Sequence, residues 1–212
     1  MRALIIGATG ATGKDLVNTL LQDPYYTKVV TFVRRSSGVT HPKLSEIMTD
    51  FNQLETVAED IKGDLLFSCL GTTLKAAGSK ENQQHIDYEI PLEFATIAKQ
   101  NGVPKTVLLS AYGASAGSKI FYSRIKGELE KGIAKLAFDQ FIVFKPGLLL
   151  RKNSDRLGER ISAGLLSFLN GIGLFKKFKG LPTEILAEKL AKAPKVFPNG
   201  SHVVELNKIF EL

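Results

Sequence analysis

The sequence has little sulfur and few of the side chains that bind metals. It holds one cysteine, three histidines and no tryptophan. The single Cys69 excludes an internal disulfide and suits a reducing compartment, and we expect it to be a small buried side chain in a strand rather than a nucleophile. His41, His85 and His202 are dispersed and lack the spacing of metal ligands, so we predict no metal site.

Long apolar runs are missing as well. We find no stretch of about 18 apolar residues and no signal peptide, and we therefore expect a cytoplasmic protein. The composition, 44% hydrophobic and 23% charged, is typical of a soluble globular protein. A chain of 212 residues is long enough for one domain with a substantial core.

Positive charge is in excess, with a formal net charge of +7. Such a balance raises nucleic acid as a partner. The cationic residues, however, are scattered along the chain, and no alternation of aromatic and basic residues accompanies them. We favour a solvated basic surface that also attracts a polyanionic cofactor, and we expect no nucleic-acid partner.

The most informative motif is GATGATG at residues 7–13, which follows the strand-forming Leu4–Ile6 and precedes an amphipathic stretch, Thr12–Leu21. A buried strand, a glycine-rich turn and a helix form the phosphate-binding unit of dinucleotide sites, and the helix directs its N–H groups at the phosphate. The first glycine permits the turn, the second the approach of the pyrophosphate, and the third close packing of helix on strand. The residues that we expect to contact the phosphates are Gly7, Thr9, Gly10, Ala11, Thr12 and Gly13.

Strand and helix signals alternate after this unit, which predicts an α/β fold with a doubly wound parallel sheet. The predicted strands are Val29–Val33, Glu46–Met48, Leu65–Leu70, Thr106–Leu109 and Phe141–Lys145. The predicted helices are Leu54–Ile61, Pro91–Gln100 and Phe121–Ala137. Ligands of such sheets bind at the carboxyl ends of the strands.

The last third of the chain has a looser pattern. A charged loop, Arg151–Arg160, precedes the apolar, glycine-rich Ile161–Phe178, and a helix at Pro182–Ala193 and an edge strand at Val203–Leu206 follow. We predict a single domain, 1–212, in which 151–202 form a small substrate cap. The basic, apolar segment 165–179 also fits binding to a membrane surface, but its glycines disfavour a stable interfacial helix, so we favour the cap.

Two arginines, Arg34 and Arg35, follow the second strand, where a site for NAD has an acidic residue that binds the ribose 2′-hydroxyl. A guanidinium group binds a 2′-phosphate instead, so we predict NADP as the cofactor; the alternative is two solvated arginines. Asp50 and Phe51 follow the third strand and are candidates for the adenine pocket. A helix N-cap is the alternative for Asp50.

A second set of residues, Ser110, Tyr122 and Lys126, fits proton transfer. Tyr122 and Lys126 are four residues apart in a predicted helix and so share a face, and Ser110 ends the fifth strand. An ammonium about 4 Å from a phenol stabilises the phenolate by up to about 4 kcal/mol at an effective dielectric constant of about 20, close to three pKa units. The tyrosine could then act as a general acid or base, with the Ser110 hydroxyl polarising a substrate carbonyl.

Together these motifs resemble the short-chain dehydrogenase/reductase superfamily, in its atypical branch. The segments FSCLGTT (67–73), LLSAYGAS (108–115), FYSRIKGELE (121–130) and VFKPGLLL (143–150) are similar to the Tat-interacting-protein family, over roughly residues 1–150. The resemblance implies a Rossmann fold, bound NADPH and a catalytic Ser110, Tyr122 and Lys126. It further places Leu70 and Gly71 along the adenosine and the nicotinamide ribose, Lys126 at that ribose, and Pro146 and Gly147 at the nicotinamide pocket. We also expect Thr72 and Tyr122 to contact the cofactor.

One feature of the superfamily is missing: we find no clear counterpart of the asparagine that completes a proton relay. Asn82, His85 and Asp87 lie in the relevant region, and a relay through water is the alternative. The function we expect is NADP-dependent oxidoreduction of a small carbonyl or alcohol compound. The alternatives are an NADPH-binding regulatory protein with little turnover and an enzyme similar to nucleotide-sugar epimerases. A homodimer could form through the helices around Pro91–Gln100 and Phe121–Ala137.

Overall fold

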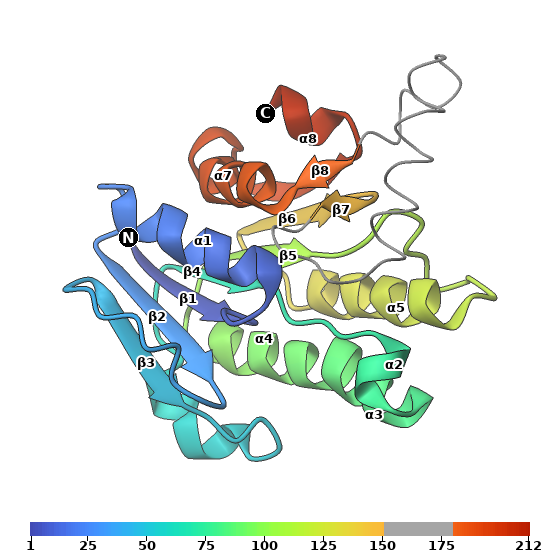
Figure 1. The fold of residues 1–212 in the computed structure, drawn as a ribbon, viewed down its shortest axis with the longest axis horizontal. Coiled ribbons are helices and arrows are strands. Elements are labelled where there is room, and N and C mark those ends of the chain that lie inside the picture. Colours follow the sequence, from blue (N-terminus) through green and yellow to red (C-terminus); the bar gives the residue numbers. More distant parts are fainter. Residues whose placement is uncertain (151–179) are drawn as a thin grey trace.

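The computed structural model describes residues 1–150 and 180–212, and a seven-stranded sheet forms their centre (Figure 1). The strand order is β3-β2-β1-β4-β5-β6-β9, and every neighbouring pair is parallel. The strands are β1 (Arg2–Ile6), β2 (Lys28–Val33), β3 (Leu44–Met48), β4 (Leu65–Ser68), β5 (Lys105–Leu109), β6 (Gln140–Lys145) and β9 (Gly200–Glu205). The order reverses between β1 and β4, which creates the switch point at which such sheets bind ligands.

Helices cover both faces of this sheet (Figure 1). One face carries α1 (Ala11–Gln22), α7 (Thr183–Val196) and α8 (Lys208–Glu211), and the other carries the 3₁₀ helix η1 (Leu54–Asp60), α4 (Ile90–Gln100) and α5 (Phe121–Lys135). The short α2 (Leu74–Ala77), α3 (Lys80–Gln84) and the π-helix η2 (His85–Glu89) lead into α4. The predicted doubly wound α/β fold is therefore confirmed.

The two faces bury separate cores because successive strand residues point in opposite directions. In β1, Ala3 and Ile5 pack with α1 and α7, whereas Leu4 and Ile6 pack with η1, α4 and α5, and all four are fully buried. The uninterrupted apolar sequence of this strand follows from burial on both sides.

Several predicted boundaries differ from the observed ones. The third strand begins earlier, at Leu44, and the fourth ends at Ser68 rather than Leu70, because the chain leaves the sheet to cross the carboxyl edge. The helix predicted at Leu54–Ile61 is a 3₁₀ helix. The predicted edge strand is confirmed as β9, although it begins at Gly200.

Much of the predicted cap lies outside the described residues, including the loop Arg151–Arg160, the segment Ile161–Phe178 and the basic residues up to Lys179. The described part, 180–202, forms β8 (Leu181–Pro182), which pairs with β7 (Leu149–Leu150), then α7 against α1, and the start of β9. The cap and the single domain 1–212 stay predictions. Within residues 1–150 and 180–212, no helix is long and apolar enough to cross a membrane.

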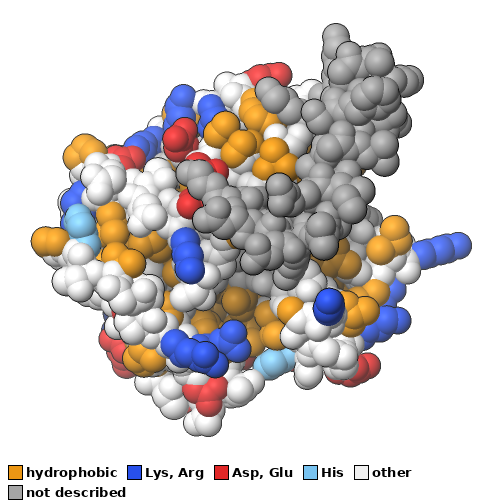
Figure 2. All heavy atoms as spheres, viewed as in Figure 1, with side chains coloured by type: hydrophobic (Ala, Val, Ile, Leu, Met, Phe, Trp, Pro, Cys, Tyr) orange, Lys and Arg blue, Asp and Glu red, His pale blue; other side chains and the backbone are white. Residues whose placement is uncertain are grey.

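Charged side chains are spread over the surface. Figure 2 shows Lys and Arg side chains at several separate places on the face seen in Figure 1, and Asp and Glu side chains near some of them. The Lys and Arg residues that are dispersed along the sequence are therefore also dispersed over the part of this face that Figure 2 shows.

Candidate functional site

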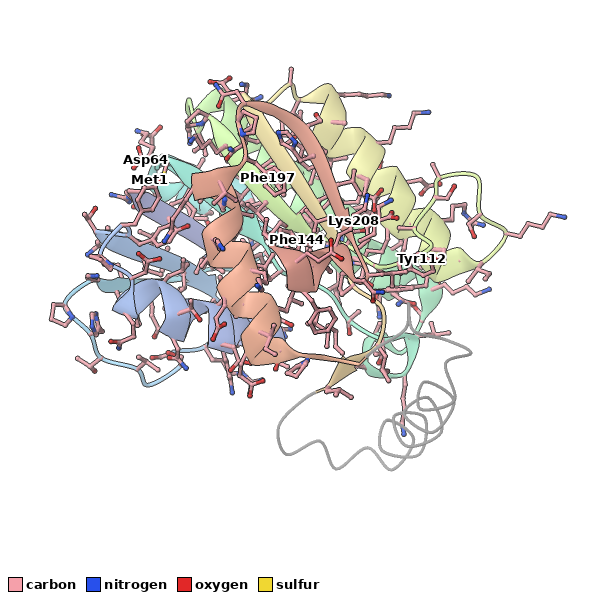
Figure 3. All side chains as sticks on the ribbon, turned by 90° about the horizontal axis from the view of Figure 1, so that it is seen from above. Met1, Asp64, Tyr112, Phe144, Phe197 and Lys208 are labelled. Atoms are coloured by element: carbon pink, nitrogen blue, oxygen red, sulfur yellow. The ribbon has the colours of Figure 1, made fainter. Side chains whose placement is uncertain are left out.

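A cavity of about 700 Å³ lies at the carboxyl ends of the strands. Figure 3 marks this end of the sheet by Tyr112, which follows β5, whereas Met1 and Asp64 mark the opposite end, where β1 and β4 begin. Of the expected site residues, the cavity is lined by Gly10, Ala11, Thr12, Gly13, Leu70, Gly71, Thr72, Ser110, Tyr122 and Lys126. The structure thus brings the glycine turn and the Ser–Tyr–Lys set to one space. Described residues expected here but outside its lining are Gly7, Thr9, Arg34, Arg35, Asp50, Phe51, Pro146 and Gly147.

The glycine turn requires glycine at two positions. Gly7 has a φ of +81°, and a Cβ there would lie 2.4 Å from the carbonyl carbon of Cys69. A Cβ on Gly13 would lie 2.0 Å from the carbonyl oxygen of Gly7, so α1 can pack this closely on the turn only without a side chain. Gly10 is the N-cap of α1 and has no side chain to accept from its first N–H groups. These donors line the cavity, which fits a phosphate.

Arg34 and Arg35 follow β2 at the same end of the sheet, and both are exposed. The next residues fix this loop to β3: Ser36 Oγ donates to Glu46 Oε2 at 2.6 Å, and the N–H of Ser37 donates to the same oxygen at 3.2 Å. Since β2 pairs with β1, the two guanidinium groups lie one strand away from the glycine turn.

Asp50 follows β3 and forms an Asx-turn. Its Oδ1 accepts from the backbone N–H of Asn52 at 3.0 Å, and its Oδ2 accepts from Gln53 Nε2 at 3.3 Å. The alternative of a helix N-cap is wrong, because the N-cap of η1 is Gln53. Phe51 is 8% exposed and packs in the core below η1 and α4.

Two further expected positions lie just beyond β6. Pro146 is buried and its carbonyl oxygen accepts a hydrogen bond from the N–H of Tyr112 at 2.9 Å. A Cβ on Gly147 would approach Leu206 Cδ2 to 3.1 Å. Both residues therefore join the carboxyl end of β6 to its neighbours rather than line the cavity.

Lys126 is buried beneath the cavity, and Asp87 is its partner. Its Nζ lies 3.8 Å from Asp87 Oδ1 and donates to the carbonyl oxygen of Leu70 at 3.4 Å. Asp87 is fully buried in the π-helix η2 and accepts from the N–H of Thr72 at 2.7 Å. A Cβ on Gly71 would lie 3.3 Å from the Asp87 carboxylate and 3.4 Å from Nζ, so this ion pair packs directly against the loop that follows β4.

The pKa directions show that this buried ion pair costs free energy. Burial raises the pKa of Asp87 above its usual value, although Lys126 and the N–H of Thr72 oppose the rise. Burial likewise lowers the pKa of Lys126, although Asp87 opposes the fall. In both groups the loss of solvation outweighs the pairing, which is the usual balance for a buried salt bridge. A costly pair beneath a cavity is a frequent mark of a functional site.

Of the three residues considered for a fourth catalytic position, the structure brings only Asp87 to Lys126. The backbone N–H of Asn82 donates to Ser79 Oγ at 3.1 Å, which caps α3. His85 binds Glu89 at 2.9 Å and Asn52 at 2.9 Å. Asp87 was one of three candidates that the sequence offered in this region. Its place in a π-helix, a rare element that often occurs at functional sites, is a local feature that could have singled it out from Asn82.

Ser110 directly follows β5, is 5% exposed and lines the cavity. The hydroxyl donates a hydrogen bond to Glu130 Oε1. Sequence reasoning missed Glu130, although it lies four residues after Lys126 on α5, so spacing alone could have found it. Tyr122 is 39% exposed and lies in the first turn of α5.

Cys69 lies one residue past β4 and also lines the cavity, so its predicted place inside the strand is wrong. The residue is half-buried, and burial of the thiol raises its pKa to about 12. A thiol with this pKa is protonated at neutral pH and is a poor nucleophile. Among residues 1–150 and 180–212, no three His, Cys, Asp or Glu side chains gather as metal ligands do.

Comparison with known proteins supports a nucleotide site. The model of a protein family described as NAD(P)H-binding matches residues 7–142, the part of the chain that carries the glycine turn and the Ser–Tyr–Lys set. The chain belongs to this NAD(P)H-binding family. Protein FMP52-1, mitochondrial, of Scheffersomyces stipitis is 36% identical, and the match covers 96% of this chain and 93% of the relative. Protein HTATIP2 of Rattus norvegicus is 35% identical over 73% of this chain and 66% of its own length.

These relatives confirm the resemblance of this NAD(P)H-binding protein to atypical short-chain dehydrogenases and the Tat-interacting-protein family. Their names also correct one expectation. The prediction of a cytoplasmic protein is wrong, because the relatives in S. stipitis, Candida albicans and other fungi are named mitochondrial.

Solved structures show the same fold at low identity. An oxidoreductase, ylbE, of Lactococcus lactis superposes with a TM-score of 0.70 at 17% identity, over 100% of this chain and 94% of its own. A UDP-glucose 4-epimerase of Thermotoga maritima superposes with a TM-score of 0.72 at 13% identity, over 97% of this chain and 76% of its own. At these identities the likeness establishes the Rossmann-type fold and nothing finer.

Proposed function

We propose that this protein is an NADP-dependent oxidoreductase that transfers hydride between the cofactor and a carbonyl or alcohol carbon of a small molecule. One observation carries the proposal: a single cavity is lined by the phosphate-binding turn and by Ser110, Tyr122 and Lys126. A protein that only bound the nucleotide would use Tyr122 and Lys126 as cofactor contacts, but it would not need the hydroxyl of Ser110 beside them.

The described residues fit the cofactor. The turn at Gly7 and Gly13 leaves no room for a Cβ, and the first N–H groups of α1 line the cavity. Across the cavity, Lys126 and the loop at Leu70–Thr72 line the wall and would contact a ribose there. The nicotinamide cofactor, when bound, supplies or takes up the hydride.

In this proposal each catalytic side chain has one task. Tyr122 gives a proton to the substrate oxygen during reduction and takes it back during oxidation. Lys126 stabilises the tyrosinate and contacts the ribose. Ser110, at the cavity wall, contacts the reacting oxygen. Asp87 keeps Lys126 in place and compensates its buried charge.

The preference for NADP rests on Arg34 and Arg35, which are exposed beside the glycine turn. A charge-assisted hydrogen bond to the 2′-phosphate contributes about 1.5–3 kcal/mol, which corresponds to roughly a tenfold to hundredfold preference. A site for NAD would carry an acidic residue after β2 instead.

The test is a titration with NADPH and NADH, followed by nicotinamide fluorescence, of the wild type and Arg34→Ala. We expect tighter binding of NADPH, and a loss in the variant that affects NADPH only. Lys62→Ala is the matched control, since Lys62 is an exposed cation paired with Glu59 before β4, at the opposite end of the sheet. Equal losses for both nucleotides in Arg34→Ala would contradict the assignment of the 2′-phosphate.

A further inference from the structure

Glu130 extends the row of active-site side chains on α5. It follows Tyr122 and Lys126 at the same interval of four residues, so all three project from one side of the helix. Its side chain is 16% exposed, although it carries a charge. Such a carboxylate needs partners, and its two oxygens have one each.

The two oxygens of Glu130 are divided between neighbouring strand ends. Oε1 accepts from the hydroxyl of Ser110, at the end of β5. Oε2 accepts from Lys145 Nζ at 2.8 Å, at the end of β6. Lys145 is itself 13% exposed and also donates to the carbonyl oxygen of Ala114 at 3.4 Å. The carboxylate therefore cannot leave Ser110 without disturbing its half-buried ion pair with Lys145.

The backbone around this contact is fixed as well. Ser110 continues the sheet, because its N–H donates to the carbonyl oxygen of Phe144 at 2.8 Å. Helix α5 contacts the backbone of the loop that follows Ser110: a Cβ on Gly127 would lie 2.2 Å from the carbonyl carbon of Ser115. Helix, loop and both strand ends are packed closely, so the position of Glu130 relative to Ser110 is set by the fold.

The direction of the Ser110 hydrogen bond determines what Ser110 offers to a ligand. A carboxylate only accepts, and a serine hydroxyl has one hydrogen to give. With that hydrogen directed at Glu130, the oxygen of Ser110 presents its lone pairs to the cavity. This differs from the polarising donor to a carbonyl that the sequence suggested.

We propose that Glu130 is a positioning residue that holds Ser110 as a hydrogen-bond acceptor, so that the site favours the alcohol form of its substrate over the carbonyl form. The inference rests on the proposed function, in which Ser110 contacts the reacting oxygen. An alcohol can donate to the Ser110 oxygen, whereas a ketone cannot. Binding of a ketone requires the Ser110 hydrogen to leave Glu130.

Glu130→Gln should reverse the direction of the hydrogen bond between residue 130 and Ser110. Lys145 carries only donors, so the amide oxygen of the substituted side chain faces Lys145 and its NH₂ group faces Ser110. Ser110 then accepts from the amide, and its own hydrogen is available to a ketone. Ser110→Ala removes the hydroxyl group itself, so it is the matched background in which Glu130→Gln should have no effect on ligand preference.

The first measurement is calorimetric binding of cyclohexanol to the NADPH complex and of cyclohexanone to the NADP⁺ complex, neither of which can react. We expect Glu130→Gln to lower the ratio of ketone to alcohol dissociation constants by about threefold to tenfold, the worth of one hydrogen bond. In the Ser110→Ala background the same substitution should leave the ratio unchanged. An unchanged ratio in Glu130→Gln, or an equal shift without the serine, overturns the proposal.

The second measurement needs no ligand and separates this inference from the proposed function. Urea unfolding of Ser110→Ala, Glu130→Ala and the double variant measures the coupling between Ser110 and Glu130, because neither single variant keeps the hydrogen bond between them. We expect each single substitution to raise the unfolding constant about threefold or more, and the effect of the double variant to fall short of the product of the two single effects by about threefold or more, since loss of the ion pair with Lys145 does not depend on Ser110. Additive effects would overturn the proposal even if the protein consumes NADPH.

Discussion

Removal of the negative charge of Asp87 is the most informative perturbation of the site. Asp87→Asn preserves the shape of the side chain but leaves the Lys126 ammonium buried without a counter-charge, 3.8 Å from the former carboxylate. At an effective dielectric constant of about 20, this separation corresponds to about 4 kcal/mol, or about three pKa units. The loss of one partner of a buried pair is expected to cost about 3–5 kcal/mol of unfolding free energy.

The effect should depend on pH in a defined direction. Burial already lowers the pKa of Lys126, and without Asp87 it falls further. Between this folded-state pKa and the unfolded value, about 10.4, the unfolded chain binds more protons, so stability rises with pH. Relative to the wild type, the deficit in unfolding free energy of Asp87→Asn should be largest near neutral pH, where the wild type carries both charges of the pair. It should shrink toward pH 10, where the buried lysine has lost its proton.

The assay is urea unfolding of wild type and variant at intervals from pH 6 to pH 10. Lys126→Met in the Asp87→Asn background removes the unpaired charge and should abolish the pH dependence of the deficit. Glu59→Gln, which removes a solvated carboxylate from the surface pair with Lys62, should leave the midpoint unchanged. A deficit that stays constant from pH 6 to pH 10 would refute the reasoning.

Two further predictions concern the cavity. Gly13→Ala should weaken NADPH binding at least about tenfold and lower the unfolding free energy by about 1–3 kcal/mol, because its Cβ would overlap the backbone of Gly7. Gly117 has open space around it, so the control Gly117→Ala should change neither quantity. Fluorescence titration and urea unfolding check both effects. Cys69 should react with a thiol reagent at pH 8 far more slowly in the native protein than after denaturation, since burial raises its pKa to about 12; equal rates would show that the thiol is accessible and ionised.

The parts of this site that the sequence predicts are those built from neighbouring residues. The glycine turn, its strand and α1 occupy one continuous segment, and each glycine has a local backbone reason. The spacing of Tyr122 and Lys126 likewise needs only the period of a helix. Ser110 was predictable because it ends an apolar strand and parallel strands end at one edge.

The partners of Ser110 and Lys126 were not predictable in the same way. Asp87 reaches Lys126 from a separate element, a π-helix, and no residue pattern in that segment marks a π-helix. Glu130 lies four residues after Lys126, but its contact with Ser110 depends on how α5 packs against β5. Its contact with Lys145 depends in the same way on how α5 packs against the neighbouring strand β6. The sequence also suggested that Lys126 acts on Tyr122 as an isolated ammonium. Pairing with Asp87 partly cancels that charge, so its effect on the tyrosine is smaller than the lone-charge value.

The most direct test of the central claim is the consumption of NADPH by wild type and Tyr122→Phe with a panel of ketones and aldehydes, with NADPH affinity measured for both proteins. The account predicts turnover by the wild type, a loss of at least about hundredfold in the variant, the scale of general acid–base catalysis, and unchanged NADPH affinity. Equal turnover by the two proteins would remove Tyr122 from the chemistry. Tight NADPH binding with no turnover by the wild type would contradict the enzyme and favour an NADPH-binding regulatory protein.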